Sequence, residues 1–205
     1  GTIRPMQTHT AARRKMIIDT DTASDDAVAI LMALRWPGVD VLAITVVMGN
    51  VDVEQGGRNA RYTVDLCGAK TPVHIGCAKP LTRKPVFAHW YHGPDGMGGM
   101  NYPESPAPIA DGHAVDVLID LIKRNPGEIE LITLGPLTNI AAALARAPEI
   151  APLVGRCVIM GGAAVTIGNV TPAAEYNMWV DPEAAQIVLR SGMAIELVSW
   201  ETALG

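Results

Sequence analysis

The sequence predicts an α/β protein in which helices cover both faces of a mainly parallel β-sheet. Two observations predict this fold class. Short runs that are almost continuously apolar alternate along the chain with amphipathic runs of helical spacing. Strands that are apolar throughout are buried on both sides, which is typical of parallel strands between two layers of helices. The 205 residues, 49% of them apolar and 18% charged, fit one sizeable domain with a buried core.

The first half of the chain alternates regularly between the two kinds of run. Its elements are expected, in order, as the strand 16–19, the helix 25–36, the strand 39–49, the helix 53–68 and the strand 72–76. Pro37 and Gly38 end the first helix, because proline cannot continue a helix. Gly68 ends the second, at the position where glycine commonly closes a helix.

A long loop, 77–112, rich in Gly, Pro and His, separates the two halves. It exceeds ordinary connection lengths, so we expect a lid or a binding loop. The remaining elements are expected as the helix 113–125, the strand 128–135, the helix 137–147, the strand 156–162, the helix 181–192 and the strand 194–200. No internal repeat or linker interrupts this order. We therefore expect a single domain over 16–205, preceded by a loose tail, 1–15.

Composition argues against several classes of partner and setting. The net charge is −5 and no basic run reaches five residues, which argues against nucleic acid and acidic membranes as partners. No apolar run approaches membrane-spanning length, and the opening segment lacks the apolar core of a signal peptide. Cys67, Cys77 and Cys157 form no CxxC pair, which favours a reduced, cytoplasmic setting.

Four carboxylates crowd the end of the first strand, in the stretch "DTDTASDD". Asp25 and Asp26 begin the next helix, where acids complement the helix dipole and where Ser24 or Asp25 can cap free N–H groups. This structural interpretation accounts for the second pair but not for Asp19 and Asp21 beside it. A hard divalent cation such as Ca²⁺ or Mg²⁺, bound by oxygen atoms, would remove the repulsion among all four.

Other polar segments follow later strands of the expected sheet. They are Gly49-Asn50, "GPLTN" at 135–139 and the segment 161–177. In parallel sheets, ligands bind beyond the carboxyl ends of the strands, so we expect these segments to meet the carboxylates at one edge.

The carboxylate stretch resembles the DxDxxxDD signature of the inosine–uridine-preferring nucleoside hydrolase family. The blocks "TVVMGN", "HGPDGMGG", "LGPLTNIA", "IMGG" and "EYNMWVDPEAA" are similar to that family's blocks, in the same order and at similar spacing, from about Met16 to the chain end. The resemblance implies a Rossmann-like nucleoside hydrolase fold and Ca²⁺-dependent hydrolysis of ribonucleosides to free base and ribose. It also implies a homodimer or homotetramer.

The resemblance implies roles for the residues that match. Asp21 resembles the metal ligand that also acts as general base, and Asp26 resembles the ligand that binds Ca²⁺ through both oxygens. The main-chain carbonyl of Leu134 resembles a further ligand. Asp19 matches a signature position at which we expect a side chain that supports the metal ligands without itself binding the metal.

A second set of matching residues is implied to bind the ribose: Asp25, Asn50, Met160, Asn169, Glu175 and Asn177. Anionic and amide groups around the sugar suit the oxocarbenium-like state through which a ribosidic bond breaks. Metal-bound water is expected to attack the anomeric carbon, with Asp21 as base. His92 lies in the block that resembles the segment closing over the base, so we expect it to contact the base as part of the catalytic set.

Some of these residues also have plain structural interpretations. Asn50 suits a turn at a strand end, Met160 suits a core position, and a loop histidine such as His92 is usually solvated. Trp90 and Tyr91 either stack on a nucleobase or anchor the loop by hydrophobic contact.

Asp181 before Pro182 resembles a capped helix start, so we assign Asp181 a structural role. The family's chains usually continue well past residue 205 and supply there a further aspartate ligand and a histidine for the leaving group. We therefore expect this chain to be incomplete at its C-terminus. Glu201 follows Trp200 near the place where the family usually has an aspartate.

Two rival functions remain open from the sequence. A Mg²⁺-dependent aspartate phosphatase of the haloacid dehalogenase type also has DxD after its first strand. It needs a later lysine and an acidic pair at a downstream strand end, where this chain has "GPLTN" and "GG". The other rival is a non-catalytic nucleoside- or ribose-binding protein. Purine or pyrimidine preference is not readable from these residues.

Overall fold

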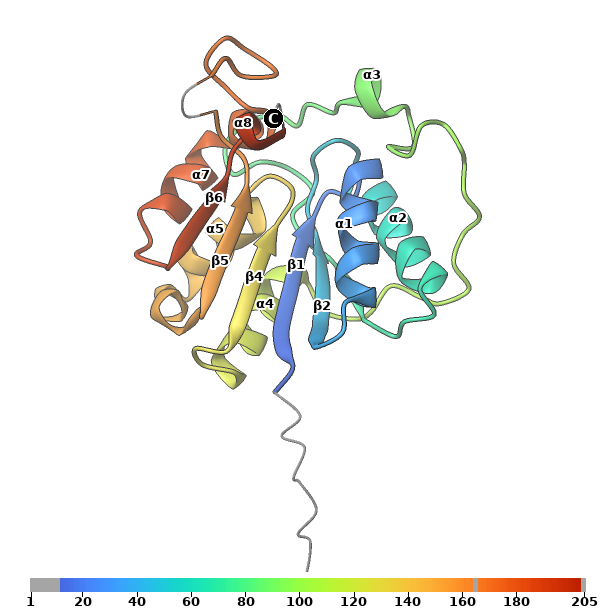
Figure 1. Cartoon of the computed structure of the whole chain (residues 1–205). Coiled ribbons are helices and arrows are strands. Elements are labelled where there is room, and N and C mark those ends of the chain that lie inside the picture. Colours follow the sequence, from blue (N-terminus) through green and yellow to red (C-terminus); the bar gives the residue numbers. More distant parts are fainter. Residues whose placement is uncertain (1–11, 164–165, 204–205) are drawn as a thin grey trace, which may run out of the picture.

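A six-stranded parallel β-sheet forms the centre of the molecule (Figure 1). The computed structural model describes residues 12–163 and 166–203. The strand order is β3-β2-β1-β4-β5-β6, and every pair of neighbours is parallel. The strands are β1 (Arg14–Thr20), β2 (Val39–Val46), β3 (Val73–Ile75), β4 (Ile129–Thr133), β5 (Arg156–Met160) and β6 (Ile195–Val198). The predicted fold class is confirmed.

The expected helices are all present, and several shorter ones accompany them. The long helices are α1 (Ser24–Arg35), α2 (Val53–Leu66), α4 (Ala114–Arg124), α5 (Thr138–Arg146) and α7 (Pro182–Leu189). The short ones are α3 (His89–His92), α6 (Tyr176–Val180), α8 (Trp200–Ala203) and the 3-10 helix η1 (Pro148–Leu153). The short helices were not predicted, because four to six residues are too few to show a helical period. In the part of the chain that the structure describes, no helix is both long and apolar enough to cross a membrane.

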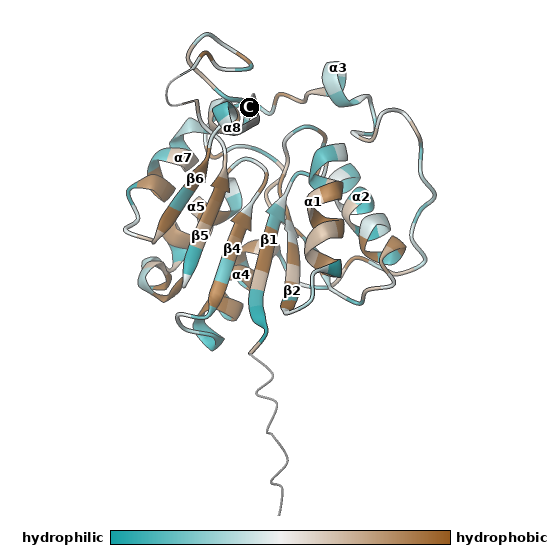
Figure 2. Ribbon diagram, in the orientation of Figure 1, coloured by the Kyte–Doolittle hydropathy of each residue, from teal (hydrophilic) through white to brown (hydrophobic). Residues whose placement is uncertain are grey.

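Apolar side chains fill the space on both faces of the sheet. Ile17 and Ile18 are neighbours in β1 and therefore point to opposite faces. Ile17 belongs to the cluster that includes Leu118 of α4 and Ile140 of α5. Ile18 belongs to the cluster that includes Ile30 of α1. Figure 1 shows α1 and α2 on one face and α4 and α5 on the other, and Figure 2 shows hydrophobic residues along the sheet between them.

The sheet has a topological switch point between β1 and β4. The chain runs outward from β1 through β2 to β3, and then from β4 through β5 to β6 on the other side. The loops after β1 and β4 therefore diverge at their carboxyl ends, which is where open α/β sheets bind ligands.

Two details differ from the predictions. The structure begins β1 at Arg14, inside the expected tail, because Arg14 pairs with Glu130 of β4 and Lys15 hydrogen-bonds Asn125. The rest of that tail, up to residue 11, lies outside the described residues. The expected capping of α1 by Ser24 or Asp25 is wrong, since the N-cap is Ala23 and no side chain caps the helix.

Candidate active site

A cavity of about 870 Å³ lies at the carboxyl edge of the sheet. Its wall combines the loops after β1, β2, β4 and β5 with the long loop that contains α3 (Figure 1). The sequence-predicted residues that line it are Asp25, Asp26, Asn50, His92, Leu134, Met160, Asn169, Glu175 and Asn177. The structure thus brings together predicted residues from five separate segments at the carboxyl edge of the sheet, as expected for a parallel sheet. Asp19 and Asp21 are fully buried next to this cavity.

Asp21 is held in one orientation by the segment that follows β2. Its Oδ2 accepts hydrogen bonds from the main-chain N–H of Asn50 at 2.6 Å and from the Asn50 side chain at 2.8 Å. Its Oδ1 is buried and has no hydrogen-bond partner among the described residues. A Cβ at Gly49 would overlap the Asp21 carboxylate, so glycine is required for this approach. Burial raises the pKa of Asp21 above its ordinary value.

Asp26 is bonded to β1 and is not a capping residue of its own helix. Its Oδ2 accepts a hydrogen bond from Thr20 Oγ1 at 2.9 Å, and that hydroxyl accepts from the main-chain N–H of Thr22 at 3.0 Å. Thr22 has a φ of +37°, a left-handed conformation that is uncommon for a β-branched residue. Burial, together with the charge of Asp21, raises the pKa of Asp26 well above its ordinary value.

Asp19 faces the interior of the sheet. Its Oδ2 accepts hydrogen bonds from Thr45 Oγ1 at 2.6 Å and from Asn139 Nδ2 at 2.8 Å. The Asn139 amide also donates to the carbonyl of Val46 and accepts from the N–H of Cys77. Burial raises the pKa of Asp19 to about 7, although these two hydrogen bonds oppose the rise. The carboxylate connects β1, β2 and α5 behind the cavity.

The segment after β5 forms the opposite wall. Glu175 caps α6, and its carboxylate accepts hydrogen bonds from the main-chain N–H groups of Gly162, Asn177 and Met178. Burial outweighs these bonds and raises the pKa of Glu175. A partly desolvated carboxylate therefore faces the cavity from a rigid position.

Asn177 joins the ends of β4 and β5. Its Nδ2 donates to the main-chain carbonyls of Leu134 at 2.8 Å and Met160 at 3.0 Å, and it lies 3.5 Å from Met160 Sδ. A carbonyl oxygen has two lone pairs, so that of Leu134 keeps one for a further contact. Asn169 approaches the same wall, where its Oδ1 accepts from the N–H of Tyr176 at 2.9 Å.

α3 carries His92 to the mouth of the cavity. His92 Nε2 lies 4.0 Å from Asp25 Oδ1, and its Nδ1 lies 3.3 Å from Ser24 Oγ. Trp90 and Tyr91 also line the cavity, yet each is 72% exposed. Neither ring is buried in a core, so the interpretation of these two residues as hydrophobic anchors is wrong.

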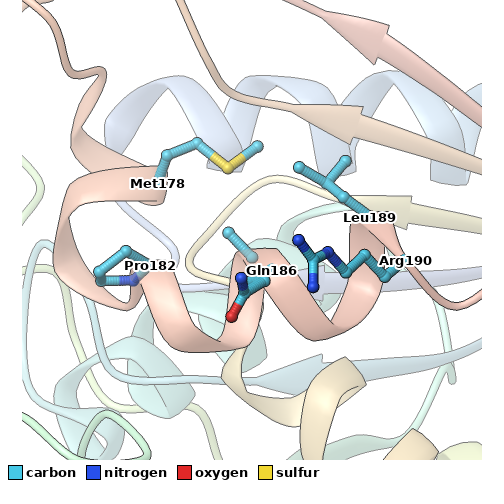
Figure 3. Close-up of a pocket in the computed structure, with 6 residues that line it drawn as sticks. Met178, Pro182, Gln186, Leu189 and Arg190 are labelled. Atoms are coloured by element: carbon cyan, nitrogen blue, oxygen red, sulfur yellow. The ribbon is translucent and has the colours of Figure 1, made fainter.

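A second hollow, of about 410 Å³, lies along α7 and holds none of the predicted residues (Figure 3). It is lined by Met178, Pro182, Ala185, Gln186, Leu189 and Arg190. Most of its surface comes from one helix, so the larger cavity is the candidate active site.

Comparison with known proteins identifies the family. The sequence model described as inosine-uridine preferring nucleoside hydrolase matches residues 16–204. The chain belongs to this family. The match covers the sheet from Met16 onward and every predicted site residue of this nucleoside hydrolase family member.

Relatives and solved structures agree with this assignment. The inosine-uridine preferring nucleoside hydrolase of Leishmania major is 44% identical over 188 residues, which span 90% of this chain and 60% of that protein. The pyrimidine-specific ribonucleoside hydrolase RihB of Escherichia coli (strain SE11) is 38% identical over 186 residues, or 91% of this chain and 59% of that protein. The chain spans about 60% of the length of the curated relatives that it matches.

The fold matches solved nucleoside hydrolases closely. A plant nucleoside hydrolase has a TM-score of 0.89 at 41% identity over 92% of this chain and 60% of its own. A purine-preferring ribonucleoside hydrolase from Gardnerella vaginalis has a TM-score of 0.87 at 39% identity over 90% of this chain and 60% of its own. The solved structures include one named for purine nucleosides and the sequence relatives include one named for pyrimidine nucleosides, so similarity alone leaves the base preference open.

Sequence reasoning missed several residues that line the cavity, Tyr176 and Trp200 among them. The Tyr176 side chain lines the cavity, and its hydroxyl oxygen lies 2.8 Å from the carbonyl oxygens of both Gly49 and Val86, which share its single hydrogen. Trp200 lines the cavity from α8. The position of Tyr176 between two predicted residues, in "EYN", was the available signal. No local pattern marks its long-range hydrogen bonds.

Proposed function

We propose that this protein cleaves the N-glycosidic bond of ribonucleosides, giving free base and ribose, with Ca²⁺ as its metal. The observation that carries the proposal is the environment of Asp21. One carboxylate oxygen is held by Asn50, and the other is buried without a hydrogen-bond partner among residues 12–163 and 166–203. A buried carboxylate oxygen of this kind is costly unless a cation or a proton compensates it.

The residues present fit a hard divalent cation. The described side chains contain no cluster of three or more His, Cys, Asp or Glu that would hold a metal on their own. The proposed ligands are instead two carboxylates, Asp21 and Asp26, and the carbonyl of Leu134, an all-oxygen set that suits Ca²⁺. A Cβ at Gly135 would lie 3.0 Å from Asp21 Oδ1, so this glycine leaves space beside the unpartnered oxygen. When bound, Ca²⁺ would offset the repulsion between the carboxylates and acidify the attacking water.

Asp21 is proposed to take the proton of that water. Asn50 occupies Oδ2 with two hydrogen bonds, which leaves Oδ1 as the oxygen that accepts the proton. The burial that raises the pKa of Asp21 also makes the carboxylate a stronger base.

The cavity wall is proposed to bind the ribose. The residues assigned to this role are Asp25, Asn50, Met160, Asn169, Glu175 and Asn177. The oxocarbenium-like state carries positive charge on the sugar ring, and the Glu175 carboxylate and the side-chain amides would stabilise it. Because three main-chain N–H groups hold Glu175, its orientation is set before the sugar binds.

His92 is proposed to contact the base from the mouth of the cavity, with Trp90 beside it as a stacking surface. Asp19 is proposed to support the site from behind through Thr45 and Asn139. The resemblance to the family also supports a homodimer or homotetramer, which sedimentation velocity would measure. The three cysteines are free, consistent with the proposed cytoplasmic setting.

Base release tests this function. The protein is incubated with inosine, uridine and p-nitrophenyl phosphate, with and without EDTA, and free base is measured by chromatography. Base release that EDTA and Asp21→Asn both abolish supports the proposal. Phosphate release without base release would favour the phosphatase, and saturable nucleoside binding without turnover would favour a binding protein.

A further inference from the structure

Asn59 of α2 lies outside the predicted site, yet its side chain connects two of the segments that form it. Asn59 is buried, and its Nδ2 donates to the main-chain carbonyls of Thr22 at 2.9 Å and Asp95 at 2.8 Å. A primary amide has two N–H bonds, so each carbonyl receives one hydrogen. Gln55 Nε2 donates to Asn59 Oδ1 at 2.9 Å and thereby keeps the nitrogen turned toward both carbonyls.

The first segment is the aspartate turn, residues 20–26. Thr22 lies between Asp21 and Asp26, the two proposed metal ligands, and has the left-handed φ of +37°. Its N–H is bonded to Thr20 Oγ1 and its carbonyl to Asn59. Both main-chain groups of this unusual residue are therefore held by side chains.

The second segment is the glycine-rich loop, residues 92–101. The Asp95 carboxylate accepts hydrogen bonds from the main-chain N–H groups of Met97 at 2.9 Å, Gly99 at 2.8 Å and Asn101 at 2.8 Å. The loop is thus folded around one side chain, and Met97 and Gly98 line the cavity. The carbonyl of the same aspartate is the group that Asn59 binds.

We propose that Asn59 is a positioning residue that couples the aspartate turn to the glycine-rich loop. Through one amide, the metal side of the cavity and the wall formed by the loop keep a fixed relative position. Asn59 acts through Thr22 and Asp95 and contacts no substrate. The kinetic consequences rest on the proposed function, whereas the mechanical coupling does not.

Two substitutions at Asn59 and one on the same helix test the coupling. Asn59→Ala removes both donated hydrogen bonds, and Asn59→Asp keeps the shape but places a carboxylate oxygen against two carbonyls. Thr63→Val is the matched control. Thr63 is buried, and its hydroxyl donates to the Asn59 main-chain carbonyl at 2.8 Å, so its loss weakens α2 without touching either segment.

Amide hydrogen exchange on the full chain measures the coupling without substrate. In Asn59→Ala we expect residues 20–26 and 92–101 both to exchange at least tenfold faster, while peptides from β4 keep their protection. Thr63→Val should leave both segments unchanged. If Asn59→Ala fails to fold, Gln55→Ala, which only frees the amide orientation, should accelerate the same two segments about threefold. Two results would overturn the proposed coupling. One is faster amide exchange in only one of the two segments of Asn59→Ala, and the other is an equal rise in exchange of both segments in Thr63→Val.

A double-mutant cycle gives the kinetic test. Asn59→Ala removes the bond to the Asp95 carbonyl, and Asp95→Asn loosens the loop that presents this carbonyl. Because both changes release the loop from α2, each should lower kcat/KM for inosine about tenfold and the double variant should be no more than about twofold worse than either. The losses of kcat/KM caused by Thr63→Val and Asp95→Asn should instead multiply in the double variant. Multiplicative losses for Asn59→Ala with Asp95→Asn would overturn the proposal. Wild-type protein without nucleoside turnover would contradict the proposed function, and the exchange experiment would still decide the coupling.

Discussion

Asn50 donates both of its hydrogen bonds to a single oxygen of Asp21: the main-chain N–H lies 2.6 Å and the side-chain amide 2.8 Å from Oδ2. Because both donors meet the same oxygen, the two carboxylate oxygens have different surroundings. Oδ2 is fully engaged with protein, and Oδ1 is left for a cation or a proton. This asymmetry leaves Oδ1 as the oxygen available for both of the roles proposed for Asp21, metal ligand and base.

Removing the Asn50 side chain should lower catalysis more than stability. Asn50→Ala keeps the main-chain bond but loses the side-chain one, and a hydrogen bond to a charged group contributes about 1.5–3 kcal/mol. We expect kcat/KM for inosine to fall about 10- to 100-fold, measured by base release. Gln186→Ala, in the remote hollow on α7, should leave kcat/KM unchanged. Full activity of Asn50→Ala would show that this bond does not orient Asp21 for the reaction.

Ca²⁺ should stabilise the protein through Asp26. A ligand at 100 times its Kd adds about 2.7 kcal/mol to the free energy of unfolding, which corresponds to about 5–10 °C in Tm for a chain of this size. We expect Ca²⁺ to raise Tm by this amount, EDTA to reverse the rise, and Asp26→Asn to abolish most of it. Asp116→Asn, which removes an exposed partner of Arg146, is the control and should respond like wild type. If Ca²⁺ raised the Tm of Asp26→Asn as much as that of wild type, Asp26 would not be a Ca²⁺ ligand.

Asp181 should matter for stability and not for chemistry. Its buried carboxylate caps α7 by accepting from the N–H of Ala184, and it also accepts from Thr138 Oγ1 at 2.7 Å and from the N–H of Leu81 at 2.9 Å. Asp181→Ala leaves three donors unpaired, two of them buried, and should lower the free energy of unfolding by about 3–5 kcal/mol, measured in urea. Asp181→Asn keeps one carbonyl oxygen as an acceptor, so its free energy of unfolding should fall less than that of Asp181→Ala. A loss below about 1 kcal/mol for Asp181→Ala would contradict this structural role.

Asp95 should make the glycine-rich loop sensitive to acid. Burial alone would raise the pKa of Asp95, but the N–H groups of Asn101, Met97 and Gly99 outweigh it and hold the pKa below the ordinary value of 3.8. Since the folded-state pKa is lowered, the stabilisation is complete above the ordinary value and is lost as the pH falls through the lowered one. The difference in unfolding free energy between wild type and Asp95→Asn should therefore be constant from pH 5 to 7 and shrink below about pH 4. If the difference in unfolding free energy between the two proteins grew as the pH fell, the prediction would be wrong.

Much of the architecture was readable from the sequence, because burial and helical period are local properties of the chain. Alternating apolar runs predicted the strand and helix order, and the parallel sheet then placed Asp19–Asp26, Asn50 and the segments after β4 and β5 at one edge. The start of α7 at Asp181 was predicted for the same reason, since a cap involves only neighbouring residues. The short helices α3 and α6 carry too few residues for a period and were missed.

The contacts between distant residues were decided only by the tertiary structure. Sequence reasoning offered Ser24 or Asp25 as a cap of α1, whereas the structure has Ala23 at the N-cap with no side-chain cap. Nor did the sequence show that Asp26 accepts a hydrogen bond from Thr20. It gave no sign that Asn59 would reach Thr22 and Asp95, which lie 37 and 36 positions away. The sequence by itself determined which residues reach the edge of the sheet, because chain direction and burial follow local pattern. Which oxygen of Asp21 remains without a partner depends on how separate segments pack, and only the folded chain brings those segments into contact.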